Sequence, residues 1–223
     1  MHVQKERFAM NRKEFIKIAA AAAVSAPLRG FGKSAGAKRP KVYFTSDISP
    51  EGLLAAYRAL GFSAKGKVGV KIHSGEPGGH NFLQPDFIKP VVDYLHGTLV
   101  ECNTAYEGRR NTTEKHLKAI EEHGFTKIAP VDIMDSEGEL VLEIPGGLQI
   151  KKNFVGSHLK NYDSLVVLSH FKGHQMGGFG GALKNISIGI ASSHGKAYIH
   201  GAGDPSRLWD CEQNKFLESM ADA

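Results

Sequence analysis

Residues 67–102 read KVGVKIHSGEPGGHNFLQPDFIKPVVDYLHGTLVEC, and this stretch decides the fold class. Its first segment, Lys67–Ile72, places valine or isoleucine at every second position, which is typical of a buried strand. Pro85–His96 begins with proline and is followed by glycine, which indicates a helix. Thr98–Cys102 is a second apolar segment of strand length. A strand, a helix and a strand in succession predict a parallel strand pair.

The same alternation continues on both sides of this unit. Before it, Lys41–Thr45 reads as a strand, and Ser49–Leu60 reads as a helix with a serine cap, a first-turn proline and Gly61 after its end. After it, Thr113–His123 reads as a helix and Ser164–Ser169 as a strongly apolar strand. We therefore expect an α/β fold whose mainly parallel sheet is flanked by helices.

One stretch breaks this alternation. Glu139–Ile144 and Leu148–Lys152 are short segments of β character on either side of Pro145-Gly146-Gly147. Proline and glycine between two such segments are typical of a turn. We expect a β-hairpin inserted into the α/β fold.

Residues 1–37 have the parts of an export signal in the expected order, and we separate them from an α/β domain at residues 38–223. A basic stretch precedes the apolar run Ile18–Ala26, and Ala35-Gly36-Ala37 forms a cleavage pattern. The run is shorter than the roughly 20 residues of a transmembrane helix. Asn11–Lys17 resembles a twin-arginine signal with lysine in place of the second arginine, and an ordinary Sec signal is the alternative. Either signal predicts a periplasmic or cell-envelope protein.

The net charge of +5 originates in this leader. Residues 1–37 contain seven Lys and Arg against two Glu, which leaves 21 residues of each sign from Lys38 onward. Nucleic-acid binding requires a concentrated basic surface, so an electrically neutral body argues against a nucleic-acid partner. We expect a small anionic ligand or a redox partner instead. The sequence leaves the oligomeric state open.

The segment richest in polar groups follows the Ser164–Ser169 strand, at the edge where parallel sheets bind ligands. Residues 170–185 read HFKGHQMGGFGGALKN, with five glycines from Gly173 to Gly181. Glycines let the backbone approach a ligand closely and present N–H groups to an anion. Neither the Walker A nor the G-x-G-x-x-G pattern is satisfied, which argues against ATP and NAD. A glycine-rich turn needed only for close packing is the alternative. The candidate residues for binding an anion or cofactor here are Gly177, Gly178, Gly180, Gly181 and Asn185.

Lys184, His174 and His194 are the candidate catalytic residues. Burial among apolar neighbours would lower the pKa of Lys184 and suit it to act as nucleophile, base or cofactor anchor, and pairing with an anion is the alternative. His174 and His194 could serve as acid or base. His170 and His174, four residues apart, are candidate metal ligands, although the glycine between them argues against a helix. Histidines paired with solvent or backbone are the alternative.

Arg109-Arg110 follows the Thr98–Cys102 strand. An arginine can hold a carboxylate or phosphate through two parallel hydrogen bonds, which makes Arg109 a candidate for cofactor binding. A solvated basic turn is the alternative.

The segment His170–Gly203 resembles the DUF362 family, a domain of unknown function that is often associated with iron–sulfur clusters. The resemblance is carried by HFKGHQMGGFGGALKNISIGIAS at its start and by GKAYIHG near its end. Asn103–Tyr106 and Phe216–Ala223 also resemble members of that family, so the resemblance spans most of residues 41–223.

Members of this family usually continue into a cysteine-rich segment that holds a 4Fe–4S cluster. The resemblance therefore implies an iron–sulfur association, whereas the two cysteines of this chain, Cys102 and Cys211, fit no cluster spacing. We expect the chain to be incomplete at its C-terminus, with the cluster ligands outside it. A fainter likeness relates His174–Lys184 to the nickel-pincer lactate racemase family, whose corresponding His and Lys serve the cofactor.

Three functions remain open at this point. The first is an exported protein with an iron–sulfur-linked redox or maturation role, whose loop from His170 to Lys184 binds an anionic substrate or partner cofactor. The second is a metal-dependent, nickel-pincer-like isomerase with His174 or His194 as acid or base and Lys184 as anchor. The third is a non-catalytic anion-binding module or an inactive fragment. No reaction or substrate follows from the sequence.

Overall fold

The computed structural model describes residues 40–223, over which strands and helices alternate along most of the chain. The α-helices are α2 (Pro50–Ala59), α3 (Pro85–Leu95), α4 (Thr113–Glu122), α5 (Ala182–Ile190), α6 (Ser193–His200) and α7 (Gln213–Asp222). The strands are β1 (Val68–Lys71), β2 (Thr98–Glu101), β3 (Val131–Ile133), β4 (Glu139–Glu143), β5 (Lys152–Gly156), β6 (Ser164–Val167), β7 (Lys172–His174) and β8 (Gly178–Gly180). Short 3-10 helices lie at Phe125–Lys127, Ser157–Asn161 and Pro205–Arg207.

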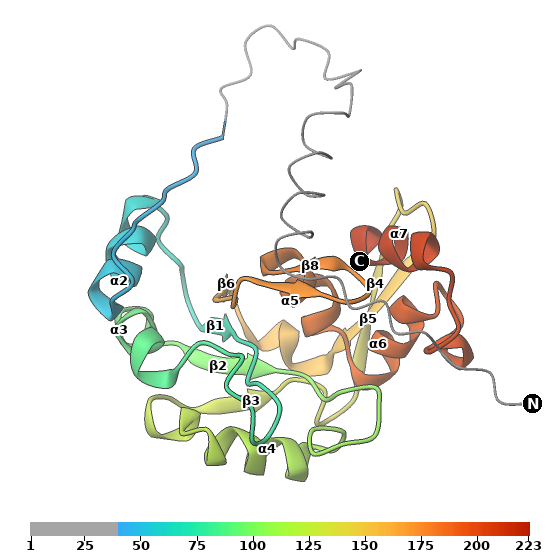
Figure 1. Cartoon of the computed structure of the whole chain (residues 1–223), viewed down its shortest axis with the longest axis horizontal. Coiled ribbons are helices and arrows are strands. Elements are labelled where there is room, and N and C mark those ends of the chain that lie inside the picture. The colour runs from blue at the N-terminus through green and yellow to red at the C-terminus, as the bar shows by residue number, and fades with distance from the viewer. Residues whose placement is uncertain (1–39) are drawn as a thin grey trace, which may run out of the picture. The chain divides into compact units, whose positions relative to one another are not determined.

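β3, β2, β1 and β6 form a parallel sheet in that order. The chain builds outward from β1 through β2 to β3 and then returns to the opposite side of β1 as β6. The strand order therefore reverses between β1 and β6, and such a reversal leaves a crevice at the carboxyl ends of the two strands. The predicted α/β fold, with a mainly parallel sheet flanked by helices, is confirmed (Figure 1).

The two faces of the sheet bury different partners. Val68 and Val70 of β1 belong to one core cluster together with residues of α2, α3 and α4. On the other face, Val100 of β2 packs in a second cluster that includes Ile190 of α5. Side chains alternate along a strand, so Lys71 of β1 lies on the α5 side of the sheet. A lysine is therefore buried between the sheet and a helix.

The helix boundaries follow the predicted capping residues. Ser49 accepts a hydrogen bond from the N–H of Gly52 at 3.0 Å at the start of α2. Gly61, just beyond that helix, has a φ of +63°, which glycine adopts without the steric cost of a side chain. Helices over Pro85–Leu95 and Thr113–Glu122 agree with the sequence to within one residue at each end.

The segment Lys41–Thr45, predicted as a strand, forms none. Val42 and Phe44 are 92% and 90% exposed, so the alternating apolar side chains of this segment do not contribute to the core. Such a pattern becomes a strand only where a neighbouring strand accepts its hydrogen bonds, and among residues 40–223 no strand pairs with this segment.

The inserted hairpin is confirmed, but its second strand lies further along the chain than predicted. β4 pairs antiparallel with β5 at Lys152–Gly156, rather than with Leu148–Lys152. The backbone N–H groups of Leu148, Gln149 and Ile150 donate instead to the carboxylate of Asp222 at 2.6–2.9 Å. The carboxylate of Asp222 on α7 thus accepts the hydrogen bonds that a partner strand would otherwise accept from these three residues.

The predicted export signal at residues 1–37 lies outside the described residues, so the signal and the cell-envelope location stay predictions. Tyr43–Ala223 form one unit of structure. Among residues 40–223, no helix is both long enough and apolar enough to cross a membrane.

Candidate functional site

A buried ion pair connects the carboxyl ends of β1 and β2. Lys71 is 1% exposed, and its ammonium group donates to Oε2 of Glu101 at 2.7 Å and to Oδ1 of Asn185 on α5 at 2.7 Å. It also donates to the carbonyl oxygen of Ile72. Asn185 in turn donates to Oγ of Ser169 at 2.9 Å. One amide thus links the ends of β1 and β6, where the strand order reverses.

Glu101 is ionised in this pair. Burial alone would raise the pKa of Glu101, but the charge of Lys71 and of other nearby cations holds it well below its ordinary range. Gly189 of α5 provides the space for the ammonium group, because a Cβ at that position would lie 2.9 Å from Nζ of Lys71. The pair adds no net charge to the crevice.

A series of hydrogen bonds between buried polar groups holds the carboxylate of Glu101 in place. The N–H of Ser74 donates to Oε1 of Glu101 at 2.8 Å, and Oγ of Ser74 lies 3.1 Å from Nε2 of His116. Nδ1 of His116 lies 3.3 Å from Oδ1 of Asn103. Burial lowers the pKa of His116 to about 4, so this ring is neutral at neutral pH. Ser74 and His116 are fully buried, so they orient Glu101 and are not reached by a ligand.

Lysines from three elements lie beside this pair, and Lys184 is close enough to the other two for their charges to act on it. Lys184 of α5 is near Lys172 of β7 and Lys196 of α6. None of the ion pairs among residues 40–223 includes any of the three. Burial, followed by the charges of Lys172 and Lys196, lowers the pKa of Lys184 to about 8. Lys196 is itself buried and donates only to the carbonyl oxygen of Ala191, at 2.6 Å.

Histidines near these lysines are uncharged at neutral pH. Burial, followed by the charge of Lys184, lowers the pKa of His174 to about 4. Burial also lowers the pKa of His200, and it lowers that of His73 to about 3. A neutral imidazole can donate or accept a hydrogen bond. The site therefore combines lysines that form no ion pair among residues 40–223 with neutral hydrogen-bonding rings.

The glycine-rich segment predicted as a ligand-binding loop is a β-hairpin that leads into α5. His174 pairs with Gly178, and its Nδ1 accepts the N–H of Gly177 at 3.0 Å. Gly178 has a φ of +64°, and the other glycines from Gly173 to Gly181 do not share this left-handed conformation. Some of the backbone N–H groups that were expected to bind an anion thus donate hydrogen bonds within the hairpin itself. The charge of the site is carried by side chains.

The remaining predicted binding residues have defined places. Gly180 pairs with Lys172 in the hairpin. Gly181 precedes α5, and a Cβ there would lie 2.6 Å from the ring of Phe179. The side chain of Asn185 is engaged by Lys71 and is not free for a ligand. Asn185 therefore organises the site, and whether these residues contact a cofactor stays a prediction.

Arg109 and Arg110 have different surroundings. Arg109 is more than half exposed and donates to both carboxylate oxygens of Glu122, at 2.6 and 2.7 Å. Arg110 is buried and pairs with Glu76, which also accepts from the hydroxyl of Tyr106 at 3.1 Å. Burial, followed by the charge of Arg110, lowers the pKa of Lys172. The structure thus brings Arg110 to the lysines and leaves Arg109, the predicted residue, in a surface pair.

His194 does not join the group around Lys184. Its Nδ1 lies 3.1 Å from Oε1 of Glu139, and its ring centroid lies 4.7 Å from that of Phe154. Further along α6, the pKa of His200 is lowered by burial and, to a smaller extent, by the charge of Lys184. The structure therefore gives His194 a carboxylate partner in the inserted hairpin, and its catalytic role stays a prediction.

His170 and His174 were the candidate metal ligands. Nδ1 of His170 is buried without a hydrogen-bond partner. Within the part of the chain that the structure describes, no group of three or more His, Cys, Asp or Glu side chains is placed to hold a metal ion. Metal binding by these two histidines stays a prediction.

The two cysteines of the chain do not fit the cluster that the family resemblance implies. Cys102 donates to the carbonyl oxygen of Ile190 at 3.3 Å, and burial raises its pKa to about 12. Cys211 packs against a different part of the core. A 4Fe–4S cluster needs four cysteine thiolates, and the chain has two cysteines in all. The ligands would have to come from elsewhere.

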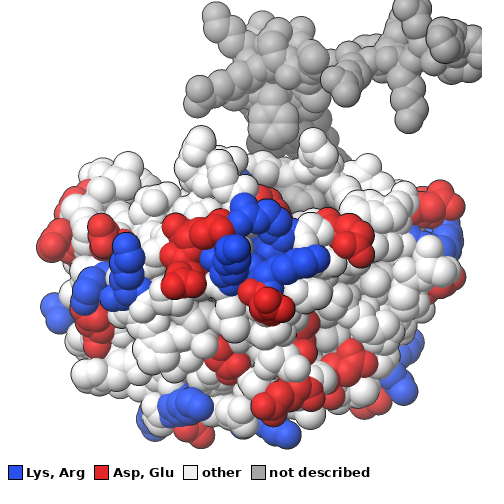
Figure 2. Space-filling model, turned by 90° about the horizontal axis from the view of Figure 1, so that it is seen from below, with Lys and Arg blue, Asp and Glu red and all other residues white. Residues whose placement is uncertain are grey.

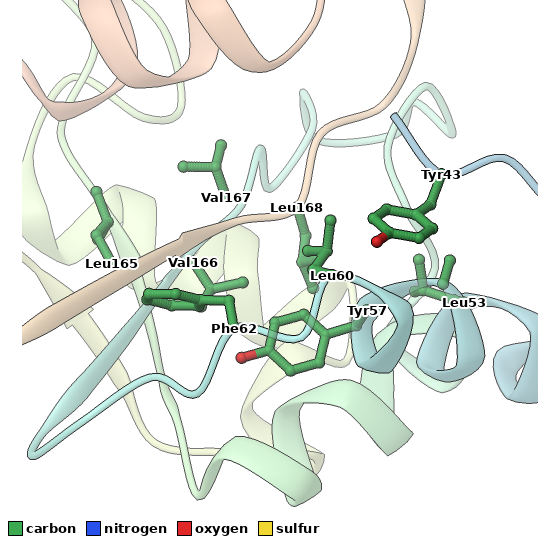
Figure 3. Close-up of a pocket in the computed structure, with 10 residues that line it drawn as sticks. Tyr43, Leu53, Tyr57, Leu60, Phe62, Leu165, Val166, Val167 and Leu168 are labelled. Carbon is green, nitrogen blue, oxygen red and sulfur yellow. The ribbon is translucent and has the colours of Figure 1, made fainter. Parts of the chain in front are cut away.

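An apolar cavity of about 360 Å³ lies between α2 and β6 (Figure 3). Leu53 and Tyr57 of α2 face Val166 of β6 and Leu168 across it. None of the residues that line it is charged, and none of the site lysines is among them. The cavity therefore cannot recognise an anion by charge and is separate from the lysine site.

Sequence reasoning missed four of the charged residues at the site, namely Lys71, Glu101, Lys172 and Lys196. Lys71 was the easiest of the four to recognise from the sequence, because it lies within the apolar segment Lys67–Ile72. A lysine is almost never fully buried unless it is paired, so a partner should have been sought. Nothing in the sequence indicated Lys196 or His200, because they approach Lys184 only through the packing of α5 against α6.

Charges of both signs are interspersed on the face of the molecule shown in Figure 2. A group of Lys and Arg side chains near its centre is bordered by Asp and Glu. This face presents no broad surface of a single sign.

The fold and the lysines together define an α/β protein with a candidate anion site at the carboxyl edge of its parallel sheet. The family model described as Domain of unknown function (DUF362) matches residues 68–223, which is more than half of the chain. The protein belongs to this family, and the resemblance carried by the segment His170–Gly203 is confirmed. No curated protein and no solved structure matches the chain.

Proposed function

We propose that the protein binds a small polyvalent anion, a phosphate or a carboxylate, among Lys172, Lys184 and Lys196. The observation that carries this proposal is that none of these three lysines forms an ion pair within residues 40–223, and that only Lys172 and Lys196 are influenced by carboxylates at longer range. Holding like charges together in a partly buried place is unfavourable unless a counter-charge is present. A bound anion supplies that counter-charge at the edge of the sheet where α/β proteins bind ligands.

Lys184 is a group of this site that can exchange a proton near neutral pH. Its pKa of about 8 leaves both the ammonium and the amine accessible, and a pKa close to the working pH favours acid or base catalysis. His174 lies near enough for the charge of Lys184 to affect its pKa. These two residues are the ones we propose to act on a bound ligand.

Anion binding is expected to weaken as the pH rises through about 8. Lys184 is mostly protonated at pH 7 and mostly neutral at pH 9, whereas a phosphate monoester, whose second pKa is about 6, stays a dianion across this range. The affinity for methyl phosphate should therefore fall about tenfold between pH 7 and pH 9. Titration calorimetry in buffers of different ionisation enthalpy would also detect proton uptake on binding. A constant affinity over this range would contradict the role of Lys184.

We also propose that the anion site serves an iron–sulfur-linked redox or maturation role after export to the periplasm or cell envelope. Support comes from family resemblance and from the signal-like order of residues 1–37. The cysteine ligands would belong to another segment or another chain, and the bound anion would be a substrate or a partner cofactor.

A metal-dependent isomerase of the nickel-pincer type is a second proposal. The proximity of His174 to Lys184 favours it, because an acid or base and an anchoring amine would then lie at one site. A non-catalytic anion-binding module would use the same lysines without chemistry. Chemical conversion of a bound substrate, followed by chromatography of the products, would separate an enzyme from such a module.

A further inference from the structure

β6 is an edge strand of the parallel sheet. It pairs with β1 on one side, and among residues 40–223 no strand pairs with its other side. The N–H groups of Ser164 and Leu168 donate to β1 and to the residue just before it. Backbone groups alternate in direction along a strand, so the N–H and C=O groups of Leu165 and Val167 point away from β1. An edge of this kind is a template for pairing with another strand.

The sequence of this edge does nothing to block such pairing. Proteins usually protect an edge strand with lysine, other charged residues, proline or a β-bulge. Residues 164–168 read SLVVL and contain neither a charge nor a proline. Leu165, Val166, Val167 and Leu168 all line the apolar cavity beside α2, although successive side chains of a strand point to opposite faces of the sheet. The cavity therefore runs along the open edge of β6 and does not lie under one face alone.

The same chain contains a strand-like segment that has no sheet. Lys41–Thr45 alternates apolar residues with others, as a strand does, but forms none. Phe44 is 90% exposed and Ile48 is 89% exposed, so this part of the chain does not cover the edge of its own copy. Of the segment, only Tyr43 lines the cavity, where it lies beside Leu53 of α2 (Figure 3). A segment without a sheet and a sheet edge without a strand thus occur in one molecule.

We propose that two copies of the chain exchange this segment, so that Lys41–Thr45 of each copy adds a strand to β6 of the other. Main-chain hydrogen bonds to Leu165 and Val167 would hold the added strand, and apolar side chains on one of its faces would enter the cavity. No charged residue lines the cavity, which suits the side chain of Phe44. Each copy has one segment and one free edge, so a two-fold symmetric dimer leaves neither unused.

The size of the full chain in solution is the first test, by size-exclusion chromatography with light scattering. We expect a dimer, and Phe44→Ser should weaken it about 100-fold, because each of two symmetric contacts loses an apolar side chain that contributes roughly tenfold to affinity. Leu148→Ser is the matched control, since Leu148 is 83% exposed in the connection between β4 and β5, and it should leave the dimer intact. A monomer at every concentration tested, or equal weakening by the control, would overturn the proposal.

A labelled synthetic peptide of residues 38–47 identifies the surfaces that meet. The Phe44→Ser chain keeps an open β6 edge and should bind this peptide, which fluorescence anisotropy measures. Adding Val167→Pro removes an N–H that points away from β1, a position at which an edge strand accepts proline, and should weaken the peptide at least about tenfold. The same peptide carrying Phe44→Ser should also bind at least about tenfold more weakly, and this comparison does not depend on the folding of the proline variant.

Three further outcomes would contradict the exchange of segments. A dimer that Phe44→Ser leaves intact would place the contact on another surface. A monomeric wild type whose Tm falls in Phe44→Ser would show that the segment docks on its own copy. Peptide binding that Val167→Pro leaves unchanged in a folded chain would place the segment away from β6.

Discussion

Lys184→Met is expected to reduce the affinity for methyl phosphate about 30-fold, the largest effect of any single change at the site. The variant keeps the apolar stem of the side chain and removes the central ammonium group. A hydrogen bond to a charged group contributes roughly 2 kcal/mol, which corresponds to this change in affinity. Titration calorimetry at pH 7, where Lys184 is mostly protonated, measures the loss.

An unfolded variant would also lose affinity for methyl phosphate, so the thermal stability of Lys184→Met has to be measured as well. The pKa of Lys184 is lowered by burial and by neighbouring cations, so its charge opposes folding at pH 7. We therefore expect Lys184→Met to have a Tm equal to or above that of the wild type. Lys118→Ala, at an exposed lysine of α4, should leave the affinity unchanged and serves as the matched control. An unchanged affinity in Lys184→Met would show that the site is elsewhere.

Glu101→Gln is expected to lower the free energy of unfolding by about 3 kcal/mol, the largest effect on stability. The change leaves the ammonium group of Lys71, which is 1% exposed, without its counter-charge. Removing one partner of a buried ion pair typically costs roughly 3–5 kcal/mol, because the other charge is left buried and unpaired. Urea denaturation followed by circular dichroism measures the difference.

Asp93→Asn is the control for this second prediction. Asp93 pairs with Lys89 on the surface of α3 at 2.5 Å, and exposed pairs of this kind contribute about 0.5 kcal/mol or less. The double variant Lys71→Met with Glu101→Gln should recover part of the lost stability, since no buried charge then remains. If Glu101→Gln and Asp93→Asn cost the same, the pair between β1 and β2 is not the buried contact described above.

Local patterns in the sequence were sufficient to predict most of the sheet. The alternation of apolar residues in Lys67–Ile72 and the proline and glycine that bound Pro85–His96 act over a few residues, so they remain visible without tertiary structure. The same rule failed at Lys41–Thr45, where the alternation is present but no strand lies beside it. Strand formation depends on that neighbour, which a local pattern does not contain.

The site was predicted in part, for a similar reason. The glycine-rich segment and Lys184 are recognisable along the chain, and the structure places Lys184 among other cations. Arg110 and Lys196 enter the site through burial and helix packing, which are tertiary properties. Two adjacent arginines look alike in a sequence, and only the fold buries Arg110 against Glu76 while Arg109 pairs with Glu122 on the surface.

The hydrogen bond from Asn185 to Ser169 has a consequence for how this protein could diversify. It closes residues 169–185 into a loop whose two ends are held by Ser169, just after β6, and by Asn185 of α5, both outside the hairpin. Loops whose ends are held in this way tolerate changes of length and sequence at modest cost. The β7–β8 hairpin is therefore an exchangeable module, and new ligand preferences could be introduced by grafting other hairpins between the same two anchor points.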